Sequence, residues 1–140
     1  MSGIRAGQHA FVRPWHVFVF GSTLGLVALF ERVQGFRSGR QYVLCHESPA
    51  LNHFTLVALA LVAGAFLAAV VGAATATVRS RPSRPPLLFA CMVAALALVV
   101  AADRVDADGE RRAAKLTAER QSACDYTPQV YSATPGWFSW

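Results

Sequence analysis

The stretch that decides the fold runs from Phe54 to Val78 and reads FTLVALALVAGAFLAAVVGAATATV. It contains no charged side chain, and about 20 apolar residues in a helix are enough to cross the hydrocarbon core of a bilayer. Two shorter apolar runs flank it, Trp15 to Phe30 and Pro85 to Ala102. The sequence therefore predicts an all-α membrane protein with three transmembrane helices.

The 140 residues leave room for a single domain. We predict spans over about 14–31, 54–78 and 85–102, joined by a loop over 32–53 and a connector over 79–84, with a tail over 103–140. A cleaved signal peptide is the alternative for the first run, but that run ends in Glu31 and Arg32 without a small-x-small cleavage pattern. We therefore favour a retained first span.

The net charge of +5 comes from arginines at the ends of the spans and not from one dense patch, so we expect no nucleic-acid partner. The positive-inside rule places the basic connector and the N-terminus on the cytoplasmic or matrix side of a bacterial cytoplasmic or mitochondrial inner membrane. The loop 32–53 and the C-terminus then lie on the opposite side. Arg79, Arg81 and Arg84 are candidates for contact with anionic lipid headgroups, although a purely topogenic role explains them equally well.

The tail changes character near residue 125. From Asp103 to about Ala123 it is rich in helix formers, which predicts a polar helical extension of the third span, with Gly109 as its weak point. Prolines and aromatics then dominate, and this predicts an extended arm that lies on a partner or at the bilayer interface. A frayed tail whose aromatics enter the headgroup layer is the alternative. The predicted partner-binding residues of the arm are Tyr126, Tyr131, Trp137, Phe138 and Trp140.

The three cysteines are separated by the predicted topology. Cys91 lies inside the third span, whereas Cys45 and Cys124 both fall on the outer side, where thiols can be oxidised. We therefore predict a Cys45–Cys124 disulfide, and two free thiols are the alternative if the orientation is reversed. Because the chain has no C-x-x-C pair, the bond is interpreted as structural and not as a redox centre.

Few residues have the chemistry of a catalytic or metal site. Glu31 and Asp103 are the best candidates for a functional carboxylate, but an arginine follows each, so a water-facing ion pair or a snorkelling residue is the simpler interpretation. No histidine lies near the middle of a span, and we expect no haem or other cofactor. The spacing of the remaining cluster does not impose a metal-binding geometry, so no metal is expected either. That cluster consists of Cys45, His46, Glu47 and His53.

Small residues recur along the spans, and in lipid such residues let helix backbones approach closely. The predicted helix-packing residues are Gly21, Gly25, Ala60, Gly64, Ala68, Gly72 and Ala76. An adjacent stripe contains Ala65, Ala69, Ala73 and Thr77. These faces serve contacts within the chain or with other subunits, and the sequence leaves both open.

These features together lead to a functional hypothesis. We expect a non-catalytic accessory subunit that packs against larger integral membrane subunits and clamps neighbours with its outer loop and arm. A respiratory or photosynthetic complex is a hypothesis about context. One alternative is a small homo-oligomeric channel or transporter, although the spans carry no charge of the kind that ion pathways use. The other is a membrane enzyme acting on lipid or quinone through Glu31, His46, Glu47 and His53.

Overall fold

The computed structural model describes residues 13–78, 85–119, 128–134 and 136–137, apart from the side chains of residues 36, 76, 78 and 85. In these ranges the chain forms the helices α1 (Pro14–Ser38), α2 (Pro49–Val78) and α3 (Pro85–Glu119) and the strands β1 (Gln41–Leu44) and β2 (Gln129–Ser132). All three helices are long and apolar enough to cross a membrane. The predicted all-α membrane architecture with three spans is confirmed.

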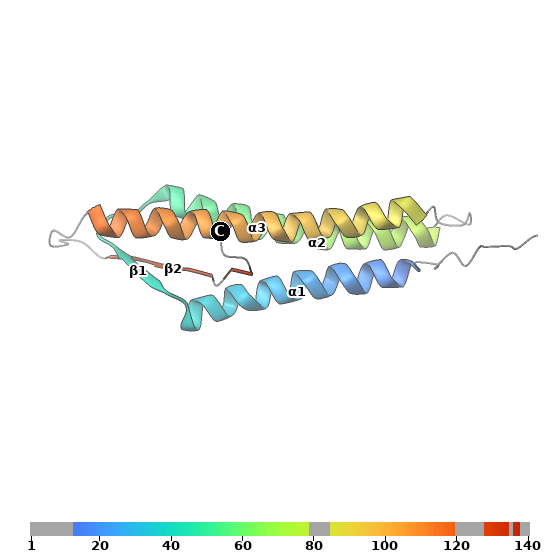
Figure 1. Ribbon diagram of the computed structural model, residues 1–140, viewed down its shortest axis with the longest axis horizontal. Coiled ribbons are helices and arrows are strands. Elements are labelled where there is room, and N and C mark those ends of the chain that lie inside the picture. Colours follow the sequence, from blue (N-terminus) through green and yellow to red (C-terminus); the bar gives the residue numbers. More distant parts are fainter. Residues whose placement is uncertain (1–12, 79–84, 120–127, 135, 138–140) are drawn as a thin grey trace, which may run out of the picture.

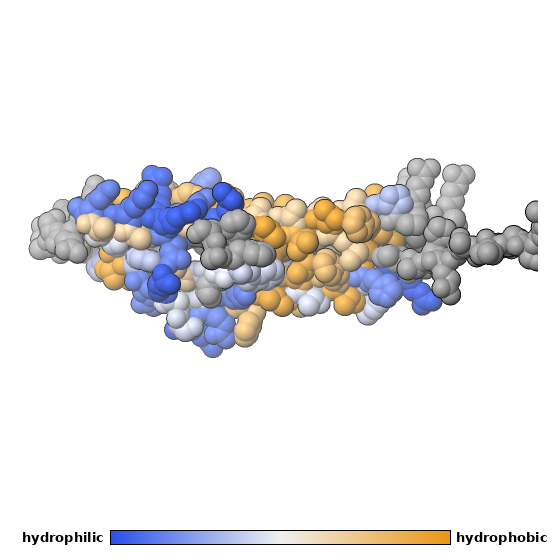
Figure 2. All heavy atoms as spheres, viewed as in Figure 1, coloured by the Kyte–Doolittle hydropathy of each residue, from blue (hydrophilic) through white to orange (hydrophobic). Residues whose placement is uncertain are grey.

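The molecule is elongated, with α2 and α3 side by side and α1 diverging from them toward its C-terminal end (Figure 1). Hydrophobic side chains cover most of one half, and hydrophilic side chains gather on the other half, with a smaller hydrophilic group at the far end of the apolar half (Figure 2). We call the apolar half the stem, which comprises residues 14–30, 54–78 and 86–102. We call the polar half the head, which comprises residues 31–53, 103–119 and the described residues of 128–137.

The helices extend beyond the apolar runs into the head. α1 continues to Ser38 and α2 begins at Pro49, so the segment predicted as a loop over 32–53 contains the end of α1, the strand β1 and the start of α2. α3 continues as a polar helix to Glu119, and Gly109 lies inside it without ending it. Hydropathy marks where a helix meets lipid, whereas the helix itself continues for as long as its residues find partners.

A two-stranded antiparallel sheet closes the head, and the sequence analysis did not predict it. β1 pairs with β2 in a register that places Tyr42 opposite Tyr131 and Leu44 opposite Gln129. The pairing continues beyond the strands, because the Ala133 N–H donates to the Arg40 carbonyl at 2.8 Å. β1 and β2 lie where α1 diverges from α3 (Figure 1). The extended arm predicted for the tail therefore folds back on its own chain over these residues.

The stem is held by a stripe of α2 that differs from the predicted four-residue ladder. Its buried members are Ala58, Val62, Ala65, Ala69 and Gly72, with spacings that alternate between three and four residues. A strict four-residue repeat advances by about 40° per step around a helix of 3.6 residues per turn, so the five ladder positions wind through about 160°. A straight helix therefore cannot present the whole ladder to one neighbour.

The ladder residues accordingly have different environments. Ala60 is exposed, Gly64 and Ala68 are half-buried, and Gly72 is buried. The side chain of Ala76 is outside the described part of the structure. Packing within the chain thus uses Gly72 together with Ala65 and Ala69 of the adjacent stripe, and it leaves Ala60 and Thr77 on the outer surface of α2.

Gly21 and Gly25 bring α1 close to α2. Both glycines are buried, and a methyl group added to Gly21 would overlap the Cβ of Ala69. One added to Gly25 would lie 2.5 Å from the Phe66 ring. The G-x-x-x-G pair of α1 therefore packs against a helix of the same chain.

Gly21→Ala is expected to lower the free energy of unfolding by about 1 to 3 kcal/mol, because α1 must move away from Ala69. Gly64→Ala is the matched control, since its new methyl group would meet Leu98 Cδ1 at an ordinary 3.5 Å. Alanine is also the better helix former, so this variant should be at least as stable as the parent protein. Thermal unfolding in one detergent compares the two. Equal stability would contradict the close approach of α1 and α2.

Candidate functional site

Charged residues at the junction of stem and head point into the protein. Glu31 and Arg32 follow the last uncharged residues of the α1 span, and Asp103 and Asp106 do the same on α3. Asp103 and Asp106 are buried, with 7% and 9% of their surfaces exposed. The expectation that Asp103 faces water is therefore wrong. α3 continues as a helix and directs both carboxylates toward α1 and the C-terminal segment.

Arg32 and Asp106 form a buried ion pair between α1 and α3. The Arg32 Nη2 lies 2.5 Å from the Asp106 Oδ2, and only 11% and 10% of the two side chains are exposed. The Arg32 Nη1 also donates to the Ala28 carbonyl at 2.9 Å, whereas its buried Nε has no hydrogen-bond partner among the described residues. Arg32 thus pairs with α3 and not with the neighbouring Glu31 that the sequence suggested.

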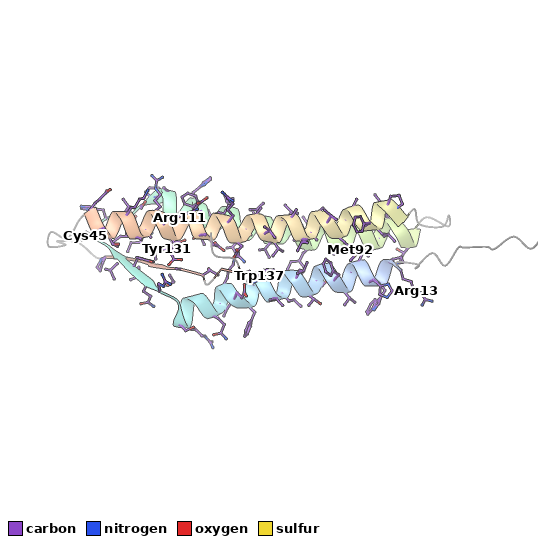
Figure 3. All side chains as sticks on the ribbon, in the orientation of Figure 1. Arg13, Cys45, Met92, Arg111, Tyr131 and Trp137 are labelled. Atoms are coloured by element: carbon purple, nitrogen blue, oxygen red, sulfur yellow. The ribbon has the colours of Figure 1, made fainter. Side chains whose placement is uncertain are left out.

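Trp137 joins the other two carboxylates of the junction. Its backbone N–H donates to the Asp103 Oδ1 at 3.0 Å, and its indole lies beside Glu31. Its ring packs against the hydrophobic core of the stem. The Trp137 side chain lies in the region between α1 and α3 (Figure 3). One residue of the predicted arm thus links α1 to α3.

A second group of polar side chains lies within the head, farther from the stem. The Tyr42 hydroxyl donates to the Glu110 Oε1 at 2.9 Å, and the Arg40 Nη1 lies 3.4 Å from the same oxygen. Burial, together with the hydrogen bond to Glu110, raises the pKa of Tyr42. This group ties β1 to α3.

Tyr131 lies against the backbone of α3. A methyl group added to Gly109 would overlap the Tyr131 hydroxyl, so the glycine in the polar extension makes room for this side chain. Burial raises the pKa of Tyr131 to about 12, and the negative charges of Asp106 and Glu110 add to the effect. Tyr131 therefore keeps its proton at neutral pH.

A cavity of about 420 Å³ opens at this junction between α2 and β2. Its polar side includes Arg32, Asp106 and Tyr131, and its apolar side includes Leu56, Leu59 and Val130. Asn52 and Gln129 also line it, and the Gln129 Nε2 donates to the Asn52 Oδ1 at 3.1 Å. The cavity is amphipathic, with an ion pair and a phenol on one side and aliphatic side chains on the other.

Comparisons of the chain with protein family models, curated proteins and solved structures gave no match.

The predicted cysteine and histidine sites fall at the far end of the head. Cys45, His46 and Glu47 line a smaller cavity of about 170 Å³, next to Thr117 of α3. Cys45 does not carry a free thiol, whereas Cys91 does. Cys124 lies outside the described residues, so its bond to Cys45 stays a prediction. In the ranges that the structure describes, no three His, Cys, Asp or Glu side chains gather as metal ligands.

The other predicted site residues lie in different environments. Tyr131 and Trp137 pack inside the chain, and His53 is exposed on α2. The remaining predicted arm residues and the predicted lipid-contact residues lie outside the described ranges, and they are Tyr126, Phe138, Trp140, Arg79, Arg81 and Arg84.

The sequence analysis missed the cluster of Arg32, Asp106 and Tyr131. A signal for it is present on α3, where the buried residues recur at alternating spacings of three and four. One stripe of them consists of Val99, Ala102, Asp106, Gly109 and Ala113, and Asp103 is buried beside it. A carboxylate on an otherwise small and apolar helical face indicates a buried polar partner.

Proposed function

We propose that this chain is a non-catalytic accessory subunit of a larger membrane complex, and that it binds larger integral membrane subunits along the outer face of α2. The observation that carries this proposal is the composition of that face. Ala60 and Ala63 are exposed there between the exposed Leu56 and Leu67. Small residues flanked by large ones allow another helix to approach closely, and dispersion contacts then hold the two together.

The low burial of the spans also supports the proposal. Only 22% to 28% of the residues in the apolar window of each helix are buried within the chain. The rest of the apolar surface is available to lipids and to other subunits. The head adds a preformed surface, because β2 and Trp137 fix the C-terminal segment to the chain itself.

The proposed location is a bacterial cytoplasmic or mitochondrial inner membrane, with the head on the side opposite the basic connector 79–84. This orientation rests on the positive-inside rule. A respiratory or photosynthetic complex remains the proposed context.

The two alternative functions receive less support. In a pore lined by α2, threonine hydroxyls would face the path, but Thr55, Thr75 and Thr77 donate to carbonyls of their own helix at 3.3, 3.2 and 2.9 Å. For an enzyme, Glu31 would have to meet His46 and Glu47. Instead, Glu31 lies beside Trp137 at the stem junction, while His46 and Glu47 line the cavity beside Cys45.

Purification of the tagged chain from its native membrane in a gentle detergent, followed by mass spectrometry, tests the proposal. We expect a stoichiometric set of larger membrane proteins. The double variant Ala60→Phe/Ala63→Phe should lose them, because two phenyl groups keep a neighbouring helix at a distance. Ala94→Phe/Ala97→Phe is the matched control, with two exposed alanines at the same spacing on α3.

Two results would contradict the proposal. One is a chain that purifies only with copies of itself, which favours the channel. The other is an Ala60→Phe/Ala63→Phe variant that retains every partner, which removes the role of the α2 face.

A further inference from the structure

The cavity between α2 and β2 lies where the apolar stem meets the polar head. We propose that it binds one phospholipid with a zwitterionic, ammonium-bearing headgroup. The phosphate oxygens of this lipid accept hydrogen bonds from Tyr131 and Arg32, and its acyl chain follows Leu56 and Leu59. Leu56 also borders the proposed partner face of α2, and the test below uses the chain without its partners, so the two proposals can fail separately.

The position of the cavity favours a membrane lipid as the occupant. Leu56 and Leu59 line it and are also 65% and 41% exposed, so its apolar wall continues into the outer surface of α2. An acyl chain can therefore pass from the cavity to the hydrocarbon layer along aliphatic side chains. The polar side of the cavity lies at the level where charged residues first appear on α1 and α3.

The hydrogen-bonding groups call for a ligand with acceptor oxygens. Tyr131 lines the cavity, and its hydroxyl stays protonated and able to donate. Arg32 lines the same side, and two of the five N–H donors of its guanidinium serve Ala28 and Asp106. Phosphodiester oxygens accept from both types of donor.

The charges of the cavity determine which lipid headgroup fits. Arg32 and Asp106 lie 2.5 Å apart and sum to zero, so a ligand with a net charge would remain unbalanced in a partly enclosed site. A phosphate beside Arg32 and an ammonium beside Asp106 complement the pair, and phosphatidylethanolamine carries both. The cavity volume of about 420 Å³ suits one small lipid headgroup with the beginning of one acyl chain.

Thermal unfolding of delipidated protein in detergent, combined with native mass spectrometry, tests the site. The probes are phosphatidylethanolamine, phosphatidylglycerol and diacylglycerol with identical acyl chains. We expect phosphatidylethanolamine to be retained and to raise the unfolding temperature most. Tyr131→Phe should weaken the binding of phosphatidylethanolamine about fivefold, because one hydrogen bond to the lipid headgroup is lost. Tyr42→Phe is the control, since it removes the hydroxyl of the cross-strand partner, which does not line the cavity.

A second pair of variants tests the path of the acyl chain. Leu56→Trp should obstruct the cavity and abolish retention, whereas Leu67→Trp, at a position of similar exposure on the same helix, should preserve it. Equal shifts with all three lipids, or equal retention by Leu56→Trp and Leu67→Trp, would show that lipid only coats the stem and would overturn the proposal. Preferential binding of phosphatidylglycerol or diacylglycerol would overturn the assignment of a zwitterionic lipid headgroup.

Discussion

Arg32→Met is expected to lower the free energy of unfolding by about 3 to 5 kcal/mol, because it leaves the carboxylate of Asp106 buried without its cation. Removal of one partner of a buried pair is costly, since the remaining charge keeps its desolvation penalty and loses its compensation. Methionine retains the aliphatic length of the arginine, so the loss reports the charge more than the packing. Chemical or thermal unfolding of the purified protein in a single detergent measures the difference.

Two further variants sharpen this test. Arg40→Met removes one partner of the pair with Glu110, in which the arginine is 83% exposed, and should cost less than about 1 kcal/mol. The double variant Arg32→Met/Asp106→Leu should recover most of the lost stability, because no unpaired charge remains. If Arg32→Met costs no more than Arg40→Met, the pair between α1 and α3 is not a major contact.

Loss of the predicted disulfide is expected to cause the second large decrease in stability. Cys45 directly follows Leu44, which pairs with Gln129, and five positions of chain separate Gln129 from Cys124. Five residues span up to about 17 Å, so the chain allows the two sulfurs to meet. The bond would close a loop of about 80 residues, for which the chain-entropy model gives at most about 4 to 5 kcal/mol. Membrane insertion already restricts the unfolded chain and reduces this figure.

Cys124→Ser should therefore lower the unfolding temperature, and a reductant should lower that of the parent protein to a similar value. Alkylation followed by intact-mass measurement should label one thiol without reductant, the free Cys91, and three with it. Cys91→Ala is the control that leaves the bond intact. Three labelled thiols in the untreated protein would disprove the bond.

The stem could be predicted from the sequence because its signal is local. Uncharged runs of sufficient length form helices in lipid whatever their neighbours are, since every backbone N–H and C=O must be bonded within the chain. The start of α1 at Pro14 and of α3 at Pro85 follows from prolines, which fit the first turn of a helix. The same reasoning explains why the small residues matter but not which stripe packs. Selecting Ala65 and Ala69 over Ala60 depends on where α1 and α3 lie.

The head could not be predicted in the same way because its contacts are distant in sequence. Arg32 meets Asp106 across 74 positions, and Tyr42 meets Glu110 across 68. The four-residue strands are too short to stand out, and each forms only because the other pairs with it. Arginine beside a carboxylate in sequence suggests a local ion pair, but the helix turns Arg32 away from Glu31 and toward α3.

α3 passes from the stem into the head as one continuous helix of thirty-five residues, which corresponds to about 52 Å. α3 packs against α2 and α1 and also contacts β1, so the stem and the head share one rigid element. A protein that binds the head and displaces it would therefore move the stem with it.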